Sequence, residues 1–356
     1  MKLLDKYLFL SILKKSIFSL FALVLIFIFF KFLDELSDIG SNGYTLSKAL
    51  QYLLLLLPSI FNSLLVISIM IGTVLALGQL NSQKELQIFL TGAISIKNLI
   101  FKSLSYPVII CVFLIIFFEF ISPRSIELAN QVKSSPLKNI LVKSDENIWF
   151  KKDNHFIHFY KNPNENYSVR VYEVTNKSKL ANILYKNSYD KSNLGINNST
   201  FSKINIDDKS SFFKIKDVSN ENLTLNLDIR KQHFFNRDVE VLSIFELVQS
   251  VSYSIANNLN FNKYITELLN RLIKPITLIG MILIAIPYVI NFQREASIGN
   301  RIFIAITIGV STHLLTKITS SLALKMDLIA MIGPILPTAV LLSLGYILIF
   351  LNNHRK

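Results

Sequence analysis

Residues 49–83 read ALQYLLLLLPSIFNSLLVISIMIGTVLALGQLNSQ, a run of 35 residues without a charged side chain. A helix crosses the roughly 30 Å hydrocarbon core of a bilayer with about 20 mostly apolar residues. As one helix the run would be roughly 50 Å long, so part of it must lie outside the core or bend. Pro58 is the expected break, because proline removes a helical hydrogen bond. The run therefore predicts a membrane-spanning helix.

Five other segments are long and apolar enough to cross a bilayer. They are residues 16–36, 99–121, 273–292, 302–323 and 328–351. The first continues to residue 36 without a small-residue cleavage site, so we predict an uncleaved span and not a signal peptide. The whole chain is only 17% charged, against about 25% in soluble domains. The fold class predicted is an α-helical polytopic membrane protein with six transmembrane helices, three on each side of an insert.

The insert, residues 122–263, is rich in Asn, Lys, Ser and Asp and contains short runs that alternate apolar and polar residues. These runs are residues 148–150, 155–160, 167–174, 180–185, 201–206 and 223–229. Alternation with a period of two predicts half-buried antiparallel strands, and we expect an all-β sandwich or jelly-roll domain. Ser243 and Glu246 form a capping-box pattern, which predicts a helix from about residue 243. Residues 1–121 and 264–356 then form the two transmembrane parts.

The net charge of +13 fits a nucleic acid, a membrane surface or an anionic substrate as partner. With a cytoplasmic N-terminus, the short inside segments hold 11 Lys and Arg, whereas the short outside loops hold only Lys48 and Lys325. The positive-inside rule thus places both termini in the cytoplasm and the β domain outside. Most of the excess charge reflects membrane topology, so no nucleic-acid partner is expected.

Signatures of catalysis are missing from the sequence. No glycine is followed by lysine, which excludes a phosphate-binding loop, so any ATP must be hydrolysed by a partner subunit. His155 and His158 are three apart in a predicted strand and so point to opposite faces, a poor metal geometry. Cys111 is the single cysteine, so no intramolecular disulfide forms. We expect a non-enzymatic chain without catalytic residues, metal or bound cofactor.

Residues 84–93 form a candidate short cytoplasmic helix that Gly92 closes. The spacing places Leu86, Phe89 and Leu90 on one face. One interpretation is the end of the second span lying at the membrane interface. The other is a coupling helix that docks into a groove of a partner.

Lys31 and Asp34 share a helical face near the outer end of the first span. An unpaired charge costs about 2.5–3.5 kcal/mol at the bilayer centre. The pair is either a lysine that snorkels to an interfacial carboxylate or the lining of a polar cavity for a charged substrate. Glu119, His313 and Lys317 carry the same ambiguity.

Several stretches, in this order and spacing, resemble the LptF/LptG family of lipopolysaccharide export permeases over nearly the whole chain. They are residues 4–7 (LDKY), 31–34 (KFLD), 84–92 (KELQIFLTG), 148–153 (IWFKKD), 274–275 (KP) and 333–337 (GPILP). Lys31 with Asp34 is more similar to the LptG type than to the LptF type.

The resemblance implies a permease subunit, without an ATPase motif, of an ATP-driven exporter in the inner membrane. Such a subunit extracts lipopolysaccharide and passes it toward the outer membrane through a periplasmic jelly-roll bridge. The implied partners are a homologous permease, a cytoplasmic ATPase dimer (LptB-like) and periplasmic β-jelly-roll proteins (LptC- and LptA-like).

The resemblance also implies roles for single residues. Lys31 and Asp34 face the lipid cavity, and Glu85 contacts the ATPase together with Leu86, Phe89 and Gly92. Lys133 keeps one member of a basic pair after the third span, and it is the third implied contact with the lipid beside Lys31 and Asp34. The chain departs from the family where Asn130 replaces the other member and where Ser37 and Asp38 replace basic residues.

Two other functions fit the same pattern of spans and insert. A membrane-anchored sensor or scaffold would bind a ligand with its external β domain and use the spans as anchors. Alternatively, a permease of similar layout would carry another lipid or a lipoprotein. Six spans are more than anchoring requires, and residues 84–93 would have no partner in a sensor.

Overall fold

The computed structural model describes most of the chain and divides it into two compact units. The described residues are 3–40, 43–85, 96–141, 147–152, 154–161, 167–174, 180–189, 196–206, 215–225, 238–291, 298–326 and 331–354. One unit comprises Met1–Lys133 and Asn262–Lys356, and the other is Ser134–Phe261. The first boundary lies later than residue 122, because the third spanning helix continues beyond the predicted end of its apolar run.

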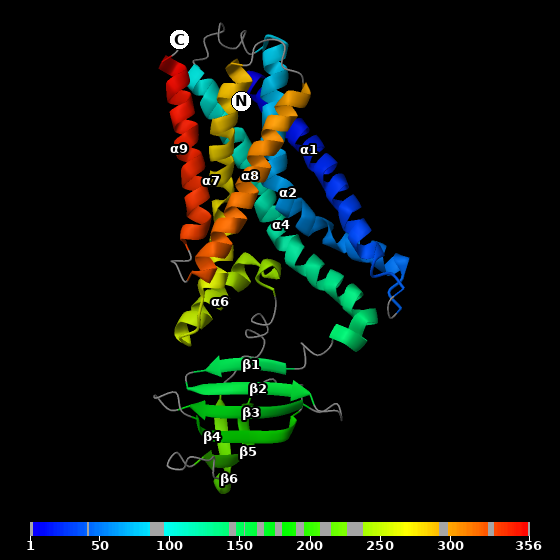
Figure 1. Ribbon diagram of the computed structural model, residues 1–356, viewed down its shortest axis with the longest axis vertical. Helices are drawn as coiled ribbons and strands as arrows, with labels where there is room; N and C mark the ends of the chain where they lie inside the picture. The colour runs from blue at the N-terminus through cyan, green and yellow to red at the C-terminus, as the bar shows by residue number, and fades with distance from the viewer. Residues whose placement is uncertain are drawn as a thin grey trace. The chain divides into compact units, whose positions relative to one another are not determined.

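The first unit is built from long helices, and the number of spans expected from the sequence is confirmed (Figure 1). The helices are α1 (Leu3–Leu36), α2 (Leu46–Ser82), α4 (Ile96–Leu141, to Lys133 in this unit), α7 (Asn262–Asn291), α8 (Ile298–Lys325) and α9 (Ile332–His354). Six helices among the described residues are long and apolar enough to cross a membrane. The start of α1 and the end of α9 lie at the same end of the bundle, as an even number of crossings requires.

Helix α2 passes through Pro58 without the expected break. Membrane helices tolerate proline because neighbouring groups and small local adjustments satisfy the backbone groups that it frees. With 37 residues the helix is about 55 Å long, so its ends extend beyond the hydrocarbon core. The expected excess length is thus real, although the proline does not end the helix.

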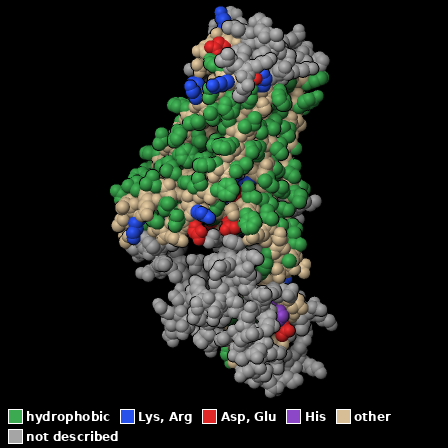
Figure 2. Space-filling view, turned by 180° about the vertical axis from the view of Figure 1, so that it is seen from behind, with side chains coloured by type: hydrophobic (Ala, Val, Ile, Leu, Met, Phe, Trp, Pro, Cys, Tyr) green, Lys and Arg blue, Asp and Glu red, His purple; other side chains and the backbone are tan. Residues whose placement is uncertain are grey.

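The core of the helical unit gathers around the second half of α2. Leu65, Ile69 and Met70 of α2 are almost fully buried, and the same cluster includes Ile12 of α1 and Leu278 of α7. Large apolar side chains cover the outside of this unit, as lipid-facing surfaces do, and Figure 2 shows them over the helices. They include Phe18, Phe21, Phe113, Phe303 and Tyr346. The distribution of apolar side chains is that of a membrane-embedded bundle.

Helices α1 and α2 approach each other closely at Gly72. A Cβ atom at this position would overlap the backbone Cα and N atoms of Ser16 on α1. Ser16, Ser19 and Ser68 beside this approach are also buried. Small residues let membrane helices pack backbone to backbone, where dispersion contacts are densest.

The second unit contains the predicted β insert. Its described strands are β1 (Asn147–Lys152), β2 (His155–Lys161), β3 (Tyr167–Val174), β4 (Leu180–Tyr189), β5 (Ile196–Ile206) and β6 (Ile215–Leu225). All pairs of neighbours are antiparallel. The first five predicted runs each lie within a strand. The sixth, residues 223–229, overlaps β6 only to residue 225, and the rest lies outside the described residues.

The strands pair in chain order, β1-β2-β3-β4-β5-β6, as in a meander. Ile157, Val169, Val171 and Leu184 are buried on one face of the sheet. On the other face Trp149 stacks on His158, with ring centroids 4.2 Å apart. The insert is all-β as expected, and its described strands are connected in chain order.

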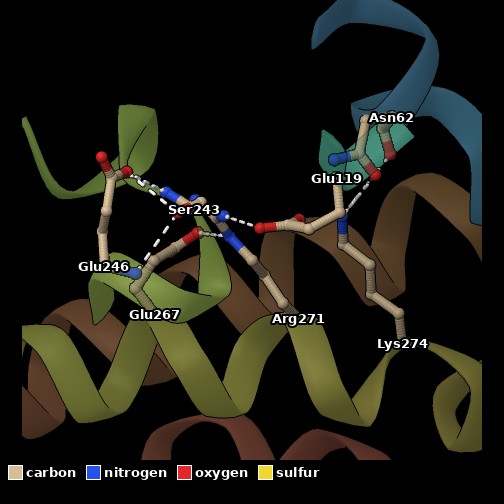
Figure 3. A network of polar contacts seen from close by, with 7 residues as sticks. All are labelled: Asn62, Glu119, Ser243, Glu246, Glu267, Arg271 and Lys274. Atoms are coloured by element: carbon tan, nitrogen blue, oxygen red, sulfur yellow. Dashed lines mark hydrogen bonds and ion pairs between the residues drawn. The ribbon is translucent and has the colours of Figure 1, made fainter. Parts of the chain in front are cut away.

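The insert ends in a short helix, α6 (Ile244–Ala256), whose start the sequence predicts correctly. The Ser243 side chain accepts a hydrogen bond from the Glu246 amide, and the Glu246 carboxylate accepts one from the Ser243 amide at 2.7 Å. Both residues are drawn in Figure 3. Tyr253 of α6 donates a hydrogen bond to the carbonyl of Lys151, which lies on the edge strand β1. This hydrogen bond satisfies one backbone carbonyl at the edge of the sheet.

Candidate functional site

The predicted Lys31–Asp34 pair lies near the end of α1. The Lys31 Nζ and Asp34 Oδ2 atoms are 3.9 Å apart, and the side chains are 44% and 72% exposed. Such an exposed pair contributes little to stability, because solvent screens it. Both side chains are therefore accessible to a ligand.

The next residue, Glu35, is buried and holds a second polar cluster together. Its carboxylate accepts hydrogen bonds from Lys133 Nζ of α4 at 2.7 Å and from the Tyr44 hydroxyl at 3.0 Å. Lys133 Nζ also lies 3.0 Å from Asp38 Oδ2 and 5.1 Å from the centre of the Tyr52 ring. Burial and the bond to Glu35 raise the pKa of Tyr44, so its hydroxyl stays protonated and donates at neutral pH.

These contacts add ion-pair partners to Lys133, for which the family resemblance implies a contact with the lipid. Its ammonium group is held by two carboxylates, one of them on a residue 98 positions earlier in the chain. The structure brings Lys133 together with Glu35 and Asp38, while Lys31 pairs with Asp34. Sequence reasoning missed Glu35 and Tyr44, since a partner so far along the chain leaves no local signal.

Polar contacts at the other end of α1 hold the start of the predicted coupling segment. The Tyr7 hydroxyl donates to Glu85 Oε2 at 2.9 Å, three residues after the end of α2. Lys102 Nζ of α4 lies 2.6 Å from Asp5 Oδ1 of α1. Glu85 is therefore positioned by α1 as well as by α2. The other predicted coupling residues, Leu86, Phe89 and Gly92, lie outside the described residues.

Two further contacts tie α7 and α8 to this end of α2. Asn81 Nδ2 donates to the Val289 carbonyl of α7 at 2.8 Å. The Arg301 side chain of α8 lies so close to Gly78 that a Cβ atom there would be 2.7 Å from Arg301 Cδ. The end of α2 before Glu85 is thus in contact with α7 and α8.

A third cluster of polar side chains lies inside the helical unit and is centred on Arg271 of α7 (Figure 3). Its Nε atom is 2.9 Å from Glu267 Oε1, and its Nη1 atom is 3.0 Å from Glu119 Oε1 of α4. Lys274, one turn along, donates to Asn62 Oδ1 of α2 at 3.4 Å. Arg271 is only 8% exposed, so this group joins α4 to α7 in a region of low solvent access.

The described residues hold no group of three potential metal ligands. His158 stacks on Trp149, and burial together with the charge of Arg170 lowers its pKa, so it is neutral at pH 7. The ring contact with Trp149 accounts for its place on the sheet.

These features define a polytopic membrane protein. It has two groups of three spanning helices with a β insert between them in the chain. Ion pairs lie at both ends of the helical unit and also inside it. Residues 6–351 match the family described as "Lipopolysaccharide export system permease LptF/LptG", and the chain belongs to this family. The resemblance inferred from short stretches is thereby confirmed.

Relatives of the chain carry the LptG name. It is 22% identical over 341 residues to the lipopolysaccharide export system permease protein LptG of Escherichia coli K12, covering 94% of each chain. It is 20% identical over 351 residues to the LptG protein of Haemophilus influenzae Rd, again with 94% of each covered. These similarities agree with the LptG-like pair Lys31 and Asp34.

Proposed function

We propose that the chain is a permease subunit of an ATP-driven exporter that moves lipopolysaccharide out of the inner membrane. It works with a homologous permease and a cytoplasmic ATPase dimer, which hydrolyses the ATP. Both termini lie in the cytoplasm, and the β insert lies in the periplasm, where it joins a bridge of β-jelly-roll proteins. The observation that carries the proposal is the family match over both groups of spans and the insert.

The exposed pair Lys31 and Asp34 is the proposed lipid contact. A lipid with anionic phosphates and apolar chains needs a cation next to an apolar wall, and the exposed Phe27 lies one turn before Lys31. Lys133 joins this contact only if it exchanges a carboxylate, Glu35 or Asp38, for a lipid phosphate. The segment that starts at Glu85 is the proposed docking site for the ATPase.

A photocrosslinking experiment tests the lipid contact. Phe27 shares the helical face of Lys31 and Asp34, whereas Phe29 points to the opposite side at nearly the same depth. With p-benzoylphenylalanine in place of Phe27, we expect ultraviolet light to attach lipopolysaccharide to the chain in cells. The same probe at Phe29 is the matched control and should capture phospholipid. Bulk phospholipid or a lipoprotein as the main product at position 27 would contradict the proposed substrate.

Co-purification tests the ATPase contact. Truncating one member of a charged interface pair costs about 2–5 kcal/mol, so Glu85→Ala should reduce recovery of the ATPase subunit in mild detergent roughly 30-fold or more. Tyr7→Phe removes only the internal hydrogen bond to Glu85 and is expected to keep most of the ATPase bound. Equal loss in both variants would show that Glu85 acts within the chain. Unchanged recovery with Glu85→Ala would contradict the docking role.

A further inference from the structure

Helix α6 exposes a narrow apolar stripe. Phe245, Val248 and Ile255 are 71%, 45% and 57% exposed. Their spacing of three and seven residues places them along one side of the helix, with Ser252 between the last two. The opposite side, formed by Leu247, Ser250 and Ser254, is buried. Helices outside the membrane seldom expose a phenylalanine and two aliphatic side chains next to one another.

The helix has well-formed ends, so the position of the stripe is fixed. The capping box satisfies its first turn. At the other end Asn258 has φ +52°, and the amides of Asn258 and Leu259 donate to the carbonyls of Ile255 and Ser254 at 3.2 and 2.8 Å. These are the two hydrogen bonds of a Schellman motif, which ends a helix and directs the chain away.

The chain connects α6 closely to the membrane. Six Cα steps separate Ala256 from Asn262, the first residue of α7, and they reach at most about 20 Å. The part of α7 that can cross the membrane extends from Asn262 to Pro287. Covalent connection alone therefore confines the end of α6 to the neighbourhood of the membrane surface.

We propose that α6 is an interfacial helix whose stripe of Phe245, Val248 and Ile255 inserts among the lipids at the membrane surface on the side of the β insert. Large apolar side chains are exposed on α7 as well, the next helix along the chain, where Leu272 and Ile276 are 53% and 46% exposed. Glu246 is the only charged side chain of α6, and the capping box holds it at the first turn. No charge within the stripe would have to leave water when it enters the headgroup region.

The function of such a helix is to hold the end of the β insert at a constant height above the bilayer. A lipid released by the spans would then meet the insert at a fixed position. This role does not depend on which lipid the chain carries. It requires only the membrane spans and the stripe on α6.

Fluorescence quenching by lipids tests the proposal on the full chain. Because Cys111 is the only cysteine, a Cys111→Ala background accepts one new cysteine at a time, at Phe245, Val248 or Ile255, for labelling with an NBD fluorophore. The protein is placed in nanodiscs of phosphatidylethanolamine and phosphatidylglycerol with or without brominated acyl chains. The matched control is Asp238→Cys, an exposed position just before α6 in the same unit.

Brominated chains are expected to quench the three stripe labels at least about twofold more than the control label, with a blue-shifted emission. Iodide in the water should quench the control label more strongly. Equal quenching at all four positions would overturn the proposal. Strong crosslinking of position 245 to another protein, with no bromine quenching, would also overturn it and would identify the stripe as a protein interface.

Discussion

Replacing Arg271 with methionine is expected to destabilise the helical unit by about 3–5 kcal/mol, the usual cost of breaking a buried ion pair from one side. Glu119 and Glu267, which are 13% and 23% exposed, would lose their common cation in a region with little water. The buried thiol of Cys111 provides the measurement, because a thiol-reactive dye labels it only when the bundle opens. We expect the apparent Tm in detergent to fall by roughly 5–10 °C.

Arg124→Met is the matched control for Arg271→Met. Arg124 is an exposed residue of α4, and the same substitution there is expected to leave the apparent Tm nearly unchanged. A triple variant with Arg271→Met, Glu119→Gln and Glu267→Gln should recover a large part of the loss, since no carboxylate then remains without its cation. If the triple variant is no more stable than Arg271→Met alone, the loss comes from packing and not from charge.

The spanning helices could be predicted because membrane insertion depends on a local property, the apolar length of a segment. All six predicted segments lie within, or nearly within, helices that can cross a membrane. The partners of charged residues are not local. The sequence marks Glu119 as a charge at the end of a span, but Arg271 follows 152 positions later. Only the three-dimensional structure shows that the two residues form one pair.

In the β insert, too, local features could be predicted from the sequence, but contacts between distant segments could not. Alternation with a period of two marks strands and their two faces, and Ile157, Val169 and Leu184 are buried as such a pattern requires. Alternation does not determine which strand pairs with which. A jelly roll and a meander need the same pattern within each strand and differ only in their connections. The predicted strands were therefore reliable, while the order β1 to β6 had to come from the structure.

In the candidate site, too, local contacts could be predicted from the sequence and distant ones could not. Lys31 and Asp34 could be found from the sequence, because residues three apart on a helix are neighbours. The role predicted for Lys133 rests on its position after the third span, and the sequence gives no sign of its ion pairs with Glu35 and Asp38. Both carboxylates lie near the end of α1, so Lys133 connects the end of the third span to the start of the proposed lipid contact.

The substitution Gly72→Ala is expected to prevent normal assembly of α1 with α2, although it adds a single methyl group. The new Cβ atom would overlap the backbone Cα and N atoms of Ser16, which cannot rotate away. Overpacking usually costs about 1–3 kcal/mol where side chains can adjust, and here the helices themselves must separate. Because α1 carries Lys31 at one end and Tyr7 at the other, the separation would disturb both proposed functional contacts. We expect little monodisperse protein in size-exclusion chromatography.

Two variants determine whether the backbone contact is the cause. Gly309→Ala makes the same chemical change on α8, but its Cβ would meet the Ile67 side chain at 3.0 Å, which a small rotation relieves. This variant is expected to be produced and folded nearly as well as the unaltered chain. Adding Ser16→Gly to Gly72→Ala removes the serine side chain and leaves the backbone in place, so it should not restore assembly. Full recovery in this double variant would show that the Ser16 hydroxymethyl group, and not the crossing of the two backbones, limits the approach of α1 to α2.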